Sequence, residues 1–127
     1  MTFQPDNFTV WMEIPVTDLE AATTFYEKVT GGALDRVEMG GAPVAVFRTK
    51  EAMKGIAGHL RIGTPAQAGS GATVHIMCAG KVEDAMARAV EAGGQLVNGP
   101  VEIPQGRFAY CTDLDGNSIG LYEPCAS

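Results

Sequence analysis

The chain has 127 residues, of which 46% are hydrophobic and 19% charged, and its 15 acidic and 9 basic side chains give a formal net charge of −6. This composition excludes intrinsic disorder and predicts a single domain over residues 1–127, large enough to bury a core without disulfides or a structural metal. The acidic charge and the scattered basic residues argue against nucleic acid as a partner, because phosphate binding requires clustered Lys and Arg.

The first half of the chain predicts a strand, a helix and three further strands. Apolar residues alternate over residues 10–16, which predicts a strand that turns Trp11 and Glu13 to the face opposite its apolar side. Asp18 is a suitable N-cap for a helix that ends at Gly31, the first of a pair of glycines. Three strands are then expected at residues 33–38, 44–48 and 56–62.

The second half repeats this order after a linker at residues 63–71, which is rich in Gly, Pro, Ala and Ser and carries no charge. A strand is expected at residues 74–79, with Val74 turned to the open face and His75 toward the helix layer. A helix follows at residues 82–90 and ends at a pair of glycines. The last strands are expected at residues 95–97, 107–112 and 118–123, with turns at 98–100 and 115–117.

The matched order of elements indicates an internal duplication. A shift of 63 positions places Glu20 on Glu83, Ala22 on Ala85 and Gly31 on Gly94. The sequence therefore predicts an α+β fold with two modules, at about residues 8–62 and 72–124. Their helices would cover one face of each sheet, and the opposite faces would line a shared cleft.

Cysteine content and apolar run lengths bear on location. No apolar run reaches the roughly 20 residues that cross a bilayer, and the first residues, MTFQPDNF, lack the features of a signal peptide. Cys78, Cys111 and Cys125 are odd in number and show no CxxC spacing, which predicts reduced thiols without a disulfide or zinc site. We therefore expect a cytoplasmic protein that makes no membrane contact.

Two segments, IPVTDLEAATTFYEKVTGG and DLDGNSIGLYE, resemble the vicinal oxygen chelate superfamily. This superfamily includes glyoxalase I, extradiol dioxygenases, methylmalonyl-CoA epimerase, and the fosfomycin and bleomycin resistance proteins. The resemblance covers about residues 8–124. It implies two paired βαβββ modules that form a U-shaped mixed sheet around a cleft, and commonly a homodimer. The resemblance does not predict a specific activity, because proteins with this scaffold catalyse many different reactions.

The resemblance also implies where a metal would bind. Metal-dependent members take a His from the first strand, a carboxylate from the fourth, a His or Gln from the fifth and a Glu from the last. The corresponding positions here are Trp11 on the first strand, Val74 on the fifth and Gly120 on the last. The fourth-strand position falls in residues 57–59, where only His59 has a side chain that could bind a metal. Trp, Val and Gly offer no suitable ligand atom. We therefore expect no metal cofactor, and neither glyoxalase I nor extradiol dioxygenase activity of the usual metal-dependent kind.

These observations favour a metal-independent protein that binds an apolar or aromatic small molecule in the cleft, on Trp11, Glu13, His59, Tyr110 and Tyr122. One alternative is a metal-free isomerase or lyase with Glu13 as the candidate catalytic acid or base, assisted by His59 or a tyrosine. Others are a glyoxalase-like enzyme with a non-standard metal site, and a structural or regulatory module.

Each candidate residue also has a purely structural interpretation. Trp11 could fill the cleft, Glu13 could pair with a nearby arginine, and His59 could be an ordinary strand histidine. The cysteines are expected to be small core residues, because no local sequence supplies the charge that activates a thiol.

Overall fold

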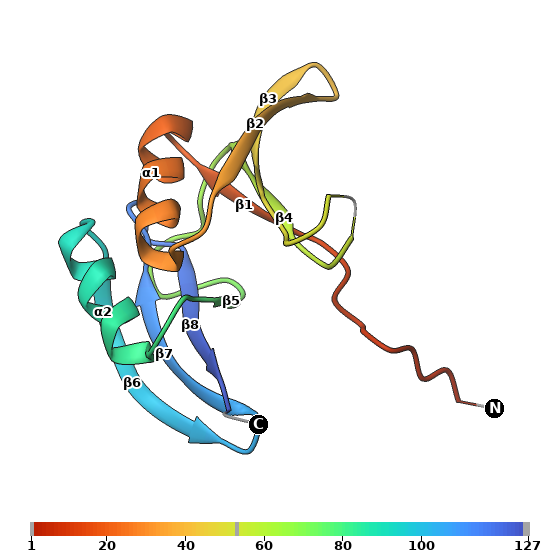
Figure 1. Cartoon of the computed structure of the whole chain (residues 1–127). Helices are drawn as coiled ribbons and strands as arrows, with labels where there is room; N and C mark the ends of the chain where they lie inside the picture. Colours follow the sequence, from red (N-terminus) through yellow and green to blue (C-terminus); the bar gives the residue numbers. More distant parts are fainter. Residues whose placement is uncertain (1, 53, 126–127) are drawn as a thin grey trace.

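A computed structural model describes residues 2–52 and 54–125 of the chain. Each half of the protein forms a four-stranded sheet covered by one helix (Figure 1). The first module contains β1 (Met12–Val16), α1 (Leu19–Thr30), β2 (Leu34–Met39), β3 (Ala42–Phe47) and β4 (Gly58–Ile62). The second contains β5 (Val74–Met77), α2 (Val82–Glu91), β6 (Gln95–Ile103), β7 (Gly106–Thr112) and β8 (Ser118–Pro124). This architecture confirms the predicted α+β fold with two βαβββ modules.

The two sheets have the same strand arrangement. Their orders are β1-β4-β3-β2 and β5-β8-β7-β6, with a parallel pair, β1 with β4 and β5 with β8, at one edge of each sheet. The other neighbouring strands are antiparallel. The first strand of each module is therefore an edge strand.

Helix α1 begins and ends where the sequence predicts. The Asp18 carboxylate accepts a hydrogen bond from the Ala21 N–H at 3.0 Å, and Gly31 ends the helix in the left-handed conformation with φ of 79°. The apolar face of α1 is buried against the sheet, with Phe25 and Tyr26 among the largest fully buried side chains. Burying such side chains contributes about 2–3 kcal/mol each.

Helix α2 begins differently, because Lys81 at its N-cap makes no side-chain capping bond. Instead the Glu123 carboxylate of β8 accepts a hydrogen bond from the Val82 N–H at 2.9 Å. Arg107 of β7 then contacts both Glu123 and Glu83. A cap supplied by the sheet attaches α2 to the strands beneath it.

Strand β6 is longer than predicted. The sequence indicates a turn at residues 98–100, but the strand continues to Ile103 alongside β7. The pairing shifts register between Leu96 and Asn98 and again between Asn98 and Val101. Such irregularities let a strand accommodate Gly and Pro without ending.

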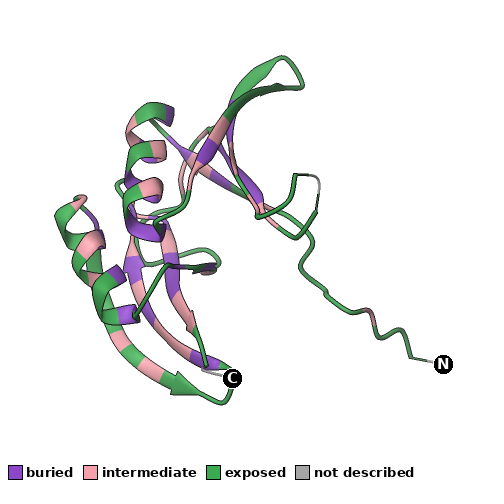
Figure 2. Ribbon diagram, in the orientation of Figure 1, coloured by how far each residue is buried: buried purple, intermediate pink, exposed green. Residues whose placement is uncertain are grey.

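The modules are joined through α1, α2 and the turn before β8. Arg88 of α2 donates hydrogen bonds to the carbonyls of Lys28 and Val29 at the end of α1. Ala79 N–H donates to the Thr30 carbonyl at 2.8 Å. Buried residues concentrate between the helices and the sheets, whereas the residues before β1 form an exposed extension (Figure 2). Over the described residues, no helix is long and apolar enough to span a bilayer.

Candidate functional site

Trp11 and His59 form a direct pair on the face of the first sheet that α1 does not cover. The Trp11 Nε1–H donates a hydrogen bond to His59 Nδ1 at 2.9 Å, and the ring centroids lie 5.9 Å apart. His59 is 5% exposed, whereas Trp11 is 43% exposed. Because the indole N–H can only donate, His59 Nδ1 must accept, which places the proton of the neutral imidazole on Nε2. The pair presents a fixed aromatic surface to solvent.

Glu13, on β1, lies next to the Trp11–His59 pair. It lies opposite His59 in the β1–β4 register, with its Oε1 3.6 Å from His59 Nε2 and 3.2 Å from Arg61 Nε. The arginine contact agrees with the structural interpretation of Glu13. The carboxylate side chain is still half-exposed and can accept hydrogen bonds from a ligand. We call Trp11, Glu13, His59 and Arg61 the tryptophan cluster.

A second aromatic group occupies the open face of the other sheet. Tyr110 packs edge-on against Phe108 and His75, with centroid distances of 5.2 and 5.8 Å. His75 also packs against Phe108 at 4.9 Å and 87°. Tyr122 lies opposite Phe108 in the register, and its hydroxyl donates to the Gln105 carbonyl at 2.7 Å. Because Tyr110 lies opposite Gly120 in the same register, Tyr110 and Tyr122 share one face.

The structure corrects the predicted orientation of β5. His75, expected to face the helix layer, lies opposite Gly120 on the open face, whereas Val74 packs against the core. The position that the resemblance assigns to the fifth strand is therefore His75, one residue later than Val74. The alternation of apolar Val74, Ile76 and Cys78 marks the helix-facing side of this strand and could have shown this.

The observed position of the His75 ring leaves no room for a side chain at Gly120. A Cβ atom at Gly120 would lie 2.2 Å from His75 Nδ1, closer than any non-bonded contact allows. The imidazole thus occupies the space that a side chain at position 120 would need. The absence of a metal ligand at Gly120 and the placement of His75 are two aspects of one local packing arrangement.

The described residues do not fit the metal that the resemblance implies. Glu13 and His59 are the two groups of the tryptophan cluster that could bind a metal, and a bound metal of this kind takes at least three protein ligands. Within residues 2–52 and 54–125, no three His, Cys, Asp or Glu side chains come together as a metal site requires. Gly120 contributes no side chain.

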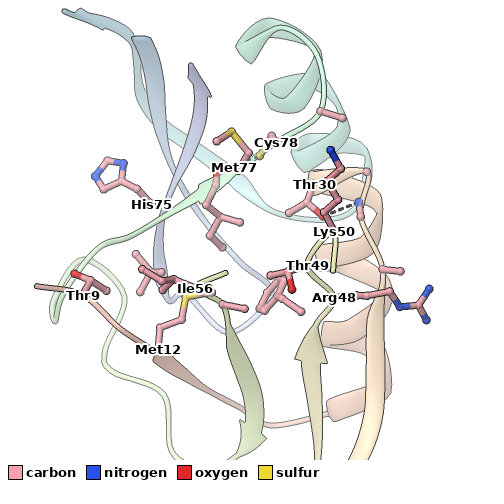
Figure 3. Close-up of a pocket in the computed structure, with 18 of the residues that line it drawn as sticks. Thr9, Met12, Thr30, Arg48, Thr49, Lys50, Ile56, His75, Met77 and Cys78 are labelled. Atoms are coloured by element: carbon pink, nitrogen blue, oxygen red, sulfur yellow. Dashed lines mark hydrogen bonds between the residues drawn. The ribbon is translucent and has the colours of Figure 1, made fainter. Parts of the chain in front are cut away.

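A cavity of about 850 Å³ lies between the modules, apart from the tryptophan cluster (Figure 3). The first module contributes residues 30–33 after α1, residues 47–50 after β3, and Met12 and Ile56, and the second contributes residues 73–79. None of the five predicted binding residues lines it, although His75 does. Sequence reasoning missed this cavity because its walls come from strand ends and loops that only the packing of the modules brings together.

The cysteine nearest the cavity is not an activated nucleophile. Cys78 lines the cavity but is only 5% exposed, and burial raises the pKa of its thiol. Burial also raises the pKa of Cys111 to about 12. Both thiols therefore stay protonated at neutral pH, in agreement with the prediction that they are core residues.

Comparison with known proteins places this geometry in a family. The family model described as the Glyoxalase/Bleomycin resistance protein/Dioxygenase superfamily matches residues 9–121. Among curated protein sequences none matches this chain.

Solved structures with the same fold come from several organisms. A glyoxalase/bleomycin resistance protein from Streptomyces sp. CB03234 is 26% identical, with a TM-score of 0.63, over 91% of this chain and 99% of that one. An antibiotic binding protein from the same organism is also 26% identical, with a TM-score of 0.61, over 97% of this chain and 100% of that one.

A glyoxalase I mutant from Zea mays is 21% identical, with a TM-score of 0.69, over 90% of this chain and 45% of that one. At this identity the likeness concerns the fold alone. Since the family model matches most of the chain, the protein belongs to the glyoxalase/bleomycin resistance protein/dioxygenase superfamily.

Proposed function

We propose that this protein binds an apolar or aromatic small molecule, without a metal ion, on the aromatic side chains of its open sheet faces. The observation that carries the proposal is Trp11, whose ring is held by His59 yet remains 43% exposed beside the Glu13 carboxylate. An aromatic ring whose orientation is already determined can stack on a flat ligand with little further loss of side-chain entropy. Glu13 would accept a hydrogen bond from the ligand.

The family supports small-molecule binding in general terms. The antibiotic binding protein from Streptomyces covers almost all of this chain at 26% identity. Membership alone does not identify the ligand, because one fold can host different activities. The choice of an apolar or aromatic ligand therefore depends on the exposed ring of Trp11 and the half-buried rings of Phe108 and Tyr110.

We further propose that the protein acts as a homodimer in the cytoplasm. The two aromatic groups lie on different sheets, and each is open on the side away from its helix. Large apolar side chains are also exposed near the N-terminus and on β5, including Phe8 at 81% and Met77 at 60%. Exposed apolar surface of this kind favours association with another copy.

Fluorescence offers a direct test, because Trp11 is the single tryptophan of the chain. Protein dialysed against EDTA would be titrated with flat aromatic compounds, alone and after addition of Zn²⁺, Mn²⁺ or Fe²⁺. We expect at least one compound to change Trp11 emission without added metal and to raise the melting temperature. A ligand at 100 times its Kd stabilises the folded state by about 2.7 kcal/mol.

Variants separate direct contact from general stabilisation. Trp11→Ala should abolish the rise in melting temperature, whereas Trp11→Phe, which keeps a ring, should retain part of it. Binding that requires added metal, or that is equally strong in Trp11→Ala, would contradict the proposal. Analytical ultracentrifugation at several concentrations tests the dimer independently.

A second candidate function is a metal-free isomerase or lyase. The specific observation is the His59 tautomer, which directs its Nε2–H toward Glu13 at 3.6 Å and places an acid and a base beside an exposed ring. Glu13→Gln would then abolish turnover of the ligand while leaving folding intact. A protein that releases every bound compound unchanged would favour binding alone.

A further inference from the structure

The cavity between the modules has a composition that differs from the rest of the chain. Its walls include the apolar side chains of Met12, Phe47, Ile56, Ile76 and Met77. None of the described residues that line it is acidic, although the chain has 15 acidic and 9 basic residues. The charged side chains at this cavity are Arg48 and Lys50, and His75 adds a titratable ring. The described lining of this cavity therefore carries no negative charge, although the chain as a whole is acidic.

The two cations differ in what they already contact. Arg48 donates two hydrogen bonds to the Asp35 carboxylate, and this ion pair raises the pKa of Arg48 and lowers that of Asp35. Figure 3 shows the Arg48 guanidinium pointing away from the other labelled side chains. Lys50 lines the cavity and makes no ion pair with any residue that the structure describes. Lys50 is the cation available to a ligand.

The backbone carbonyls at the end of α1, beside the cavity, already have hydrogen-bond donors. Helix α1 ends here at Thr30, and the free carbonyls of a helix end attract positive charge. In this protein, Arg88 donates to the carbonyls of Lys28 and Val29, and the Ala79 N–H donates to that of Thr30. The negative end of α1 is therefore already neutralised by the second module.

From these observations we propose that the cavity is a second binding site, distinct from the tryptophan cluster, and that it takes an apolar body carrying one anionic group, such as an aromatic or aliphatic carboxylate. The apolar walls would bury the body, and Lys50 would bind the anion at the rim. A volume of about 850 Å³ is sufficient for a ligand of this class. The absence of acidic lining residues removes the repulsion that this net negative chain would otherwise impose.

Calorimetric titration with a matched pair of probes tests this proposal. We would use 1-naphthoate and the neutral 1-naphthamide, which share one apolar body, at low ionic strength. Wild-type protein should bind naphthoate about fivefold more tightly than naphthamide, the upper range for a solvent-exposed ion pair. Added salt should reduce this preference, because exposed charges are screened.

Lysine variants locate the charge. Lys50→Gln should remove the preference for naphthoate and leave naphthamide binding unchanged. Lys54→Gln is the matched control, because Lys54 is on the same loop, is paired with Glu51 at 3.2 Å and does not line the cavity. Ile56→Asp, at a position that is 48% exposed, should weaken naphthoate binding more than naphthamide binding.

The outcome is independent of the proposed function. Naphthoate binding that persists in Trp11→Ala but loses its preference in Lys50→Gln supports a second site. Equal affinity for both probes in the wild type, no binding of either probe, or an unchanged preference in Lys50→Gln would overturn the proposal. Loss of naphthoate binding in Trp11→Ala with no effect of Lys50→Gln would place the ligand on the tryptophan cluster and would also overturn it.

Discussion

Removing the Tyr26 hydroxyl should destabilise the protein, because it removes a buried hydrogen bond between the two modules. Tyr26 of α1 is fully buried, and its hydroxyl donates to Asp113 Oδ2 of the second module at 2.6 Å. Burial, together with the negative charge of Asp113, raises the pKa of Tyr26 well above its ordinary value, so the hydroxyl remains a donor. Asn117 Nδ2 donates to the same oxygen and to the Pro15 carbonyl, each at 2.9 Å.

The size of the effect follows from the kind of bond that is lost. A buried hydrogen bond to a charged group contributes about 1.5–3 kcal/mol, so Tyr26→Phe should lower the free energy of unfolding by about 2 kcal/mol. For a chain of this length, about 4 °C in melting temperature corresponds to 1 kcal/mol, which gives a decrease of about 8 °C. Asn117→Ala should cost about 3 kcal/mol, because it also leaves the Pro15 carbonyl without its partner.

Urea unfolding followed by circular dichroism measures these changes. Tyr110→Phe is the matched control, because its half-buried hydroxyl makes no hydrogen bond within the described residues, and it should change stability by less than about 0.5 kcal/mol. The double variant Tyr26→Phe/Asn117→Ala should deviate from additivity, since both side chains bond the same oxygen. A Tyr26→Phe protein as stable as Tyr110→Phe would refute the reasoning.

Two further predictions concern thiols and acid stability. Cys78 and Cys111 are buried, and burial raises the pKa of both thiols, so a thiol assay on the native protein should label Cys125 alone. Unfolding should make all 3 cysteines reactive, and three reactive thiols in the native state would contradict this prediction. Arg107 lowers the pKa of Glu83, and the Val82 N–H together with Arg107 lowers the pKa of Glu123. The contribution of these ion pairs to stability is therefore present above the ordinary glutamate pKa of 4.5 and is lost as pH falls. The urea midpoints of wild type and Arg107→Gln should therefore differ at pH 7 and converge near pH 3. A difference that stays constant with pH would exclude this ion pair as the cause.

Local sequence signals predicted the elements well where short-range chemistry decides them. Asp18 and Gly31 determine the ends of α1 through a side-chain cap and a left-handed residue, and both signals are visible in the sequence. The orientation predicted for His75 is wrong, because it followed from placing Val74 on the open face, whereas Val74 and Ile76 of β5 face the core.

Contacts between distant residues decided the rest. The His59 tautomer depends on Trp11, which is 48 residues away in sequence, and the need for glycine at Gly120 depends on His75. The ends of α2 and β6 are likewise set by partners on other strands, as Glu123 shows at the start of α2.

The sequence by itself therefore determined the two modules and their order of elements, because periodicity, caps and turns are properties of neighbouring residues. Two of its segments also carried the resemblance to the family. Only the tertiary structure decided which distant side chains come together and where a cavity forms. The cavity beside Lys50 is formed by strand ends and loops from both modules, and no periodic pattern records which of them meet when the modules pack.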